Sequence, residues 1–187
     1  MDTIERLKWY GQEAARTKQF VPDVYHRFGG PMYPANAEGQ HLFHAILGMA
    51  GEASEILGVD GRKANYTENL NKEFGDWLWY AEMGAQALGT SLAELEVEQK
   101  KIRMDKTTSI YVASGANVEI MKKWLFYGKR MEAKEIIGNI VIGLAWIHCS
   151  CLDDNEFAEV LKMNIEKLRK RFPEKFTEAD AIARVDA

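Results

Sequence analysis

The chain contains an internal repeat, and this feature limits the possible folds more than any other. Three segments of the first half resemble three segments of the second: GEASEIL (51–57) and GANVEIM (115–121), KEFGDWLW (72–79) and EIIGNIVI (135–142), SLAEL (91–95) and EFAEV (156–160). The offsets are 64, 63 and 65, so one or two single-residue gaps align them. Helical proteins share composition, so chance is the alternative. A duplication predicts two helical units that bury their apolar faces against each other.

Composition favours a soluble, all-α protein. The 187 residues are 47% hydrophobic and 28% charged, with only four prolines and few alternating runs. The net charge of −4 argues against nucleic acid as a partner, since phosphate backbones call for a basic face. Two cysteines, Cys149 and Cys151, cannot form a disulfide framework. The charged N-terminus has no secretory apolar region, so we expect a cytoplasmic location.

Helical spacing of apolar residues predicts seven helices. They cover about residues 2–18, 41–57, 70–88, 91–106, 116–126, 133–149 and 155–172, and a short tail helix begins near Thr177. Asp2 with Glu5 predicts a capping box, Ser91 with Glu94 predicts a second cap, and Gly89 predicts a helix C-terminus. The Pro-rich stretch 27–39 predicts a loop. The apolar run 136–152 is shorter than a membrane span, so we expect a buried helix.

Four carboxylates carry the functional information. Glu52 and Glu55 are three residues apart on one predicted helix, and Glu73 and Asp76 are three apart on the next. Residues at this spacing share a helix face, so the two pairs can converge in a bundle. Four converging carboxylates repel one another unless cations lie between them, and oxygen ligands suit Mg²⁺ or Mn²⁺ rather than zinc.

Other interpretations of the ionisable residues are weaker. Each acidic pair could be a solvated helix face, although both have apolar neighbours. A di-iron site needs two Glu-x-x-His motifs, and only Glu38–His41 has this spacing. Cys149 and Cys151 could bind a soft metal, but on a helix they point in different directions, so we expect core residues.

The segments HLFHAILGMAGEASEIL and NLNKEFGDWLWYAEMGAQALGTSLAEL resemble the MazG-like branch of the all-α NTP pyrophosphohydrolases, a group that includes dimeric dUTPases and many phage enzymes. The ExxE…ExxD pattern is that family's metal-binding motif. KKWLFYGK (122–129) and MNIEKLRKRFPEKFTEADAIAR (163–184) resemble further parts of the family. The resemblance implies an all-α bundle and Mg²⁺-dependent cleavage of a nucleoside triphosphate to a monophosphate and pyrophosphate.

The two halves depart from the family pattern in opposite ways. Ala116, Ile136 and Asn139 replace three of the carboxylates in the second half, which keeps Glu119. Conversely, Gln99, Ile102 and Lys106 stand in the first half where the second has the polar and basic residues Asn164, Lys167 and Arg171. We therefore expect a fused pseudo-dimer with one composite site. Its parts would be an N-terminal helix and loop at 1–40, a metal-binding half at 41–106 and a degenerate half at 107–187. We also expect two chains to pair into a dimer of pseudo-dimers.

The resemblance assigns roles to residues of both halves. Glu52, Glu55, Glu73 and Asp76 would hold Mg²⁺, with Mn²⁺ as an alternative, and Glu55 would be the catalytic base. Asn164, Lys167 and Arg171, and more weakly Lys123 and Lys129, would bind the substrate. Candidates for base contacts are His41, His44, Phe74, Trp77 and Tyr80, each of which could equally be a core or surface residue.

Two questions stay open at the level of sequence. The chain could be a non-catalytic nucleotide-binding or regulatory module of the same fold. The preferred base and the biological role, whether pool cleansing, dUTP removal or supply for a phage genome with modified bases, are not encoded in any motif.

Overall fold

The computed structural model describes residues 2–17, 37–99 and 109–172, and all regular structure within these ranges is helical. The helices are α1 (Thr3–Ala15), α3 (Ala37–Gly58), α4 (Tyr66–Ala87), α5 (Leu92–Gln99), α6 (Ile110–Tyr127), α7 (Ala133–Ser150) and α8 (Asp154–Arg171). The predicted all-α class is confirmed. The predicted tail helix and most of the predicted 27–39 loop lie outside the described residues.

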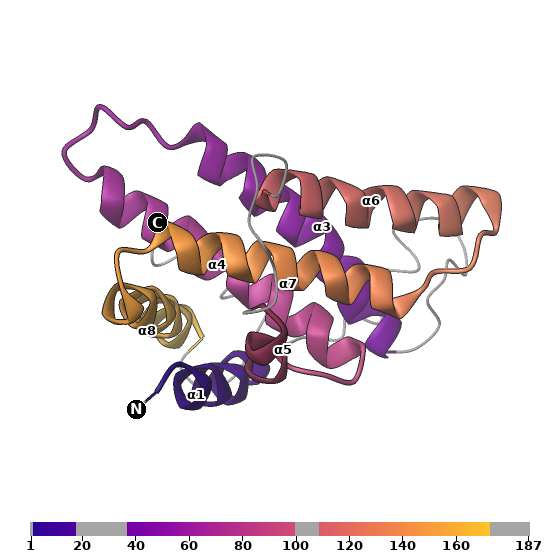
Figure 1. The fold of residues 1–187 in the computed structure, drawn as a ribbon, viewed down its shortest axis with the longest axis horizontal. Helices are drawn as coiled ribbons and strands as arrows, with labels where there is room; N and C mark the ends of the chain where they lie inside the picture. Colours follow the sequence, from indigo (N-terminus) through magenta and orange to yellow (C-terminus); the bar gives the residue numbers. More distant parts are fainter. Residues whose placement is uncertain (1, 18–36, 100–108, 173–187) are drawn as a thin grey trace.

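Two antiparallel helix pairs form the centre of the molecule. Helices α3 and α4 make the first pair, and α6 and α7 make the second, with α6 lying along α3 and α7 contacting α4 (Figure 1). Apolar side chains from both pairs meet in one core, where Met49, Trp77 and Leu144 are fully buried. The predicted burial is confirmed for most of α7, but Cys149 and Leu152 at the end of the run 136–152 are exposed.

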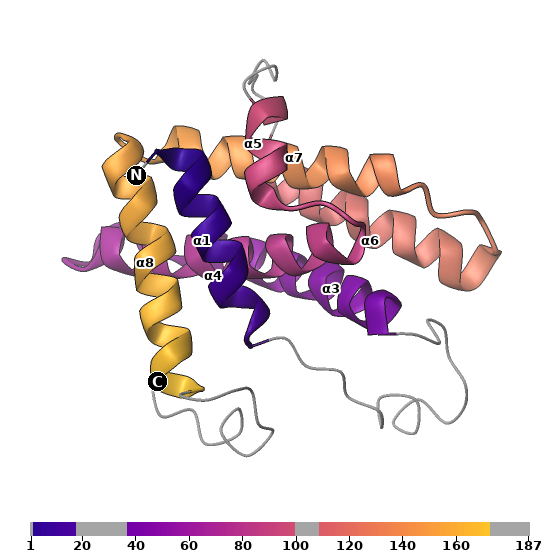
Figure 2. The ribbon, with the colours of Figure 1, turned by 90° about the horizontal axis from the view of Figure 1, so that it is seen from below.

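The three remaining helices cover these pairs in a crossed arrangement. Helix α8 crosses α4, α5 contacts α7, and α1 lies beside α8 and also contacts α5 and α4 (Figure 2). Helix α8 thus packs on α4 and α1, and α5 packs on α1 and α7. This crossing brings residues of α8 to the face of α4.

Helix ends follow the predicted caps. Asp2 and Glu5 form a capping box, the Ser91 hydroxyl accepts from the Glu94 amide at 3.3 Å, and Gly89 has a left-handed φ of 79° beyond α4. Ser109 was missed as a cap: its hydroxyl accepts from the Val112 amide, so α6 starts at Ile110 and not near residue 116. Helix α3 also starts early, at Ala37, inside the predicted loop.

A close contact between Trp77 and Gly143 joins the two helix pairs. The Trp77 indole is fully buried and donates from Nε1 to the Ser114 hydroxyl of α6 at 3.0 Å. A Cβ atom at Gly143 of α7 would lie 2.1 Å from the Trp77 ring. The absence of a side chain at Gly143 therefore sets how closely α7 approaches α4.

Replacing Gly143 with alanine should lower the free energy of unfolding by about 1–3 kcal/mol, because the indole is hydrogen-bonded and cannot retreat. Gly138→Ala is the matched control on α7, since a Cβ there meets nothing within 4 Å. It should stabilise the helix by roughly 0.5–1 kcal/mol. Urea denaturation measures both, and equal effects of the two variants would contradict this account.

Candidate metal centre

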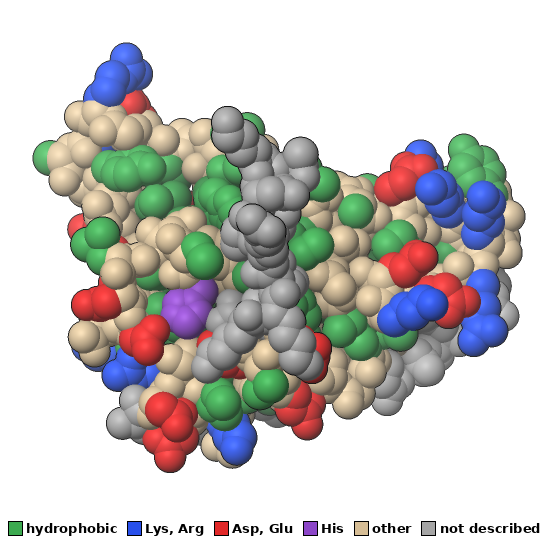
Figure 3. All heavy atoms as spheres, viewed as in Figure 1, with side chains coloured by type: hydrophobic (Ala, Val, Ile, Leu, Met, Phe, Trp, Pro, Cys, Tyr) green, Lys and Arg blue, Asp and Glu red, His purple; other side chains and the backbone are tan. Residues whose placement is uncertain are grey.

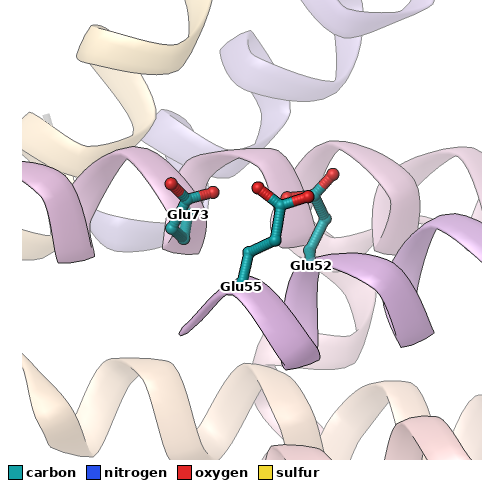
Figure 4. Close-up of side chains that lie close together, drawn as sticks. All are labelled: Glu52, Glu55 and Glu73. Carbon is teal, nitrogen blue, oxygen red and sulfur yellow. The ribbon is translucent and has the colours of Figure 1, made fainter. Parts of the chain in front are cut away.

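Three of the four predicted carboxylates converge between α3 and α4. Glu52 and Glu55 project from α3 towards α4, which carries Glu73 (Figure 4). One oxygen from each of the three lies within 4.8 Å of the others. Glu52 and Glu73 are partly buried and Glu55 is exposed, so the group is open to solvent on one side only.

The fourth predicted carboxylate, Asp76, lies beside this group and contacts α8. Its Oδ1 atom accepts from Asn164 Nδ2 at 2.7 Å, and its Oδ2 atom pairs with the Lys167 ammonium. Asp76 therefore joins the acidic group to two of the residues predicted to bind substrate. The structure thus brings Asn164 and Lys167 of α8 into contact with an acidic residue of α4.

The electrostatics of the group favour a cation. Burial, followed by the charges of Asp76, Glu55 and Glu73, raises the pKa of Glu52 to about 8, against an ordinary value of 4.5. The pKa of Glu73 is raised as well, first by burial and then by Asp76 and Glu55, while a hydrogen bond with Glu52 acts in the opposite sense. At neutral pH the metal-free site thus retains a proton, which occupies the place of a positive charge.

The donor set fits a hard divalent ion. It offers carboxylate oxygens alone, the ligands preferred by Mg²⁺ and Mn²⁺. Within the described ranges no other group of His, Cys, Asp or Glu has this proximity. Cys151 is buried, as predicted for a core residue, but Cys149, in the last turn of α7, is exposed, so the core prediction is wrong for Cys149. The di-iron alternative relied on Glu38, whose side chain lies outside the described residues.

Gly75 explains how α8 reaches the acidic group. A Cβ atom at Gly75 would lie 2.7 Å from the Cβ atom of Asn164. Since neither backbone can move independently of its helix, a larger residue would push α8 away from α4. The glycine next to Asp76 in KEFGDW therefore permits the contacts that Asp76 makes with Asn164 and Lys167.

Tyr10 of α1 is part of this centre and was missed in the sequence. Its hydroxyl, fully buried, lies 2.9 Å from Asn164 Oδ1 and 3.1 Å from the Gly75 carbonyl oxygen. Burial, then the charges of Asp76 and Glu82, raise its pKa well above the ordinary value, so the hydroxyl keeps its proton. Helical spacing places Tyr10 on the buried face of α1, but no local pattern pairs it with Asn164.

The other predicted substrate-binding residues divide into two groups. Arg171, at the end of α8, lies close enough to Tyr80 to lower the pKa of its hydroxyl. Burial and then the charge of Glu52 outweigh this effect and raise that pKa to about 12. Lys123 instead pairs with Glu119 at 3.4 Å, and Lys129 follows the C-terminal end of α6. That end lies away from the α3–α4 connection, in a region where acidic and basic side chains are interspersed (Figures 1 and 3). The structure does not bring Lys123 and Lys129 to the centre.

A cavity of about 300 Å³ adjoins the centre between α4 and α8. Its lining includes three lysines, Lys72, Lys167 and Lys170, together with Asn164. Lys72 and Lys170 were not among the predicted substrate-binding residues, because isolated lysines on amphipathic helices are common on solvated faces. Their convergence depends on the crossing of α8 over α4.

The candidates for base contacts also divide. Phe74 and Trp77 are buried in the core. The rings of His44, Trp79 and Tyr80 contact one another edge to face, with centroids 4.8–6.1 Å apart. Tyr80 is coupled electrostatically to Glu52, which places this aromatic cluster beside the acidic group. Trp79 is an addition to the predicted set.

The positions that the predicted repeat aligns with Glu52, Glu55, Glu73 and Asp76 do not form a second carboxylate cluster. Ile136 is fully buried, and Asn139 donates from Nδ2 to Asn117 Oδ1 at 2.8 Å. Glu119 pairs with Lys122 and Lys123 on its own helix. At these positions the structure therefore has apolar packing, a neutral hydrogen bond and surface ion pairs.

Comparison with family models, curated proteins and solved structures found no match to this chain. Among the helices described, none is by itself long and apolar enough to cross a membrane; α7 and α8 meet such a threshold only as a pair bent by 115°.

Glu52 makes the stability of the metal-free protein depend on pH. Between about 4.5 and about 8 the folded chain keeps a proton that the unfolded chain has lost, so the free energy of unfolding falls as pH rises through this interval. Mg²⁺ bound at this site would displace the proton, so its effect on Tm should be larger near about pH 8.5 than near about pH 5.5.

Thermal unfolding with EDTA or Mg²⁺ at the two pH values measures this effect. Glu52→Gln, which cannot ionise, should show a smaller loss of Tm between them in EDTA. A Glu52→Gln profile identical to that of the unmodified protein would show that this carboxylate is not the group responsible.

Proposed function

We propose that the protein is a Mg²⁺-dependent nucleoside triphosphate pyrophosphohydrolase, which cleaves a (d)NTP between its α- and β-phosphates to give a (d)NMP and pyrophosphate. One observation carries the proposal: Asp76, which lies beside the acidic group of α3 and α4, contacts both Asn164 and Lys167 of α8. A site for a metal–triphosphate complex needs carboxylates for the cations and basic groups for the phosphates, and here Asp76 connects the two sets.

The packing of the helices supports a MazG-type pseudo-dimer. The pairs α3–α4 and α6–α7 correspond in the repeat, and the third helices, α5 and α8, each contact the pair of the opposite half. Such reciprocal crossing is the arrangement expected when two subunits that share a site become fused. Residues 41–106 and 107–187 would then be the two halves, of which only the first retains its carboxylates.

Each side chain at the centre has a defined task in this proposal. Bound Mg²⁺ would offset the charge of carboxylates and phosphates and activate the attacking water. Glu55, the exposed member of the group, can accept a proton from that water. The ammonium of Lys167 has three donors, so it can hold Asp76 and a phosphate oxygen together.

The cavity between α4 and α8 suits the departing pyrophosphate. Lys72 and Lys170 line this cavity together with Lys167, although Glu166 also lines it and Lys72 pairs with Glu68 at 2.8 Å. Charge that develops on the leaving group would be stabilised there. The aromatic cluster of His44, Trp79 and Tyr80 lies on the same α3–α4 pair and is the candidate surface for the base.

Glu55→Gln should reduce pyrophosphate release from a (d)NTP by at least about 100-fold, because the base and one cation ligand are lost together. Glu119→Gln is the matched control at the corresponding position of the second half. Glu119 makes only partly exposed ion pairs, so the activity of Glu119→Gln should stay within about twofold of that of the unmodified protein. Coupled pyrophosphate detection with Mg²⁺ and with EDTA gives both values.

The same assay, run over all canonical and several damaged nucleotides, tests the function itself. Mg²⁺-dependent release from any of them, lost in Glu55→Gln, supports the proposal. Nucleotide binding without release across the whole panel would instead identify a non-catalytic module.

A further inference from the structure

We propose that Tyr10 is a positioning residue of the metal centre: through the amide of Asn164 it holds the Asp76 carboxylate in the orientation that a cation requires. The inference rests on the proposed function only in that the acidic group binds a divalent cation. It adds α1, which lies outside the repeated halves, to the machinery of the site.

The first step is a hydrogen-bonded chain across three helices. The Tyr10 hydroxyl of α1 lies 2.9 Å from Asn164 Oδ1 of α8, and Asn164 Nδ2 donates to Asp76 Oδ1 of α4 at 2.7 Å. Tyr10 is fully buried and Asn164 is only 3% exposed, so water does not compete for these groups. The three side chains form a continuous path from α1 to the acidic group.

The second step concerns the direction of the Asn164 amide. An amide has a donor end and an acceptor end, and a carboxylate can only accept. Asp76 therefore requires the NH₂ end, and this leaves Oδ1 facing Tyr10, whose single hydroxyl proton can be donated to Oδ1 at 2.9 Å or shared with the Gly75 carbonyl oxygen at 3.1 Å. Each end of the amide meets the complementary group, so the orientation is fixed from both sides.

The third step concerns what the amide does for Asp76. Asn164 holds one carboxylate oxygen and Lys167 holds the other, which fixes the plane of the carboxylate beside Glu52 and Glu73. Each oxygen has a second lone pair, so both can still approach a cation. Groups that orient a ligand in this way commonly change metal affinity about 10–100-fold when removed.

A purely structural role would have different consequences. The Tyr10 ring packs in the core with Leu7 and Ala14, and Tyr10→Phe keeps that ring. If the hydroxyl only stabilised the packing of α1, its removal would lower Tm and leave cation affinity unchanged. If it positions Asn164, affinity falls as well.

The experiment compares Tyr10→Phe with Tyr111→Phe in the full chain. Tyr111 lies on α6, where its ring contacts Trp146, and it is the matched loss of a phenol hydroxyl away from the centre. Titration with Mn²⁺ alone should give an affinity about 10-fold weaker for Tyr10→Phe and within about twofold of the unmodified protein for Tyr111→Phe. Adding Tyr10→Phe to Asn164→Ala should cause no further loss, because Tyr10 acts through Asn164.

A second measurement needs no metal. In the metal-free protein, the side-chain NH₂ protons of Asn164 should exchange with solvent faster in Tyr10→Phe than in the unmodified protein, as seen by NMR. Unchanged exchange, or unchanged Mn²⁺ affinity with a lower Tm, would overturn the proposal. If the unmodified protein bound no Mn²⁺, the proposed function would fail, and the exchange rates would still decide whether Tyr10 holds Asn164.

Discussion

Repulsion among half-buried carboxylates is the constraint to which the rest of the molecule responds. Glu52 and Glu73 lie close together on adjacent helices, and burial raises the pKa of both. The energetic cost of placing these carboxylates close together is reduced by the hydrogen bond between Glu52 and Glu73 and by the Lys167 ammonium. Helix α8 crosses α4 at this point and brings the Lys167 ammonium to Asp76, and Gly75 permits the close approach of the two helices.

The positions that the proposed repeat aligns with Glu73 and Asp76 make neutral contacts. Asn139 bonds to Asn117, and Ile136 lies in the core. Helix α8 contributes Asn164 and Lys167, which contact Asp76. The acidic residues of the centre thus come from α3 and α4, and the amide and ammonium that contact Asp76 come from α8.

The parts of the site that were predictable from sequence share a local origin. The spacing of Glu52 with Glu55 and of Glu73 with Asp76 follows from helix periodicity, so their convergence could be expected from two adjacent helices. The caps at Asp2 and Ser91 are local for the same reason. Tyr10, Lys72 and Lys170 could not be predicted, because their roles depend on how α1 and α8 cross α4. Lys123 and Lys129 were placed by a motif, and in the structure they belong to a different end of the bundle.

The hydrogen bond between Tyr10 and Asn164 joins residues 154 positions apart, so the centre depends on both the first and the last helix of the described chain. During synthesis, the acidic helices leave the ribosome well before the helix that neutralises them. Until residues as far as Arg171 have emerged, a nascent chain cannot form the contacts of Asp76 with Asn164 and Lys167. The junction of α1, α4 and α8 can therefore form only after nearly all of the described chain has been made, and the contacts of Asp76 report that these three helices have come together.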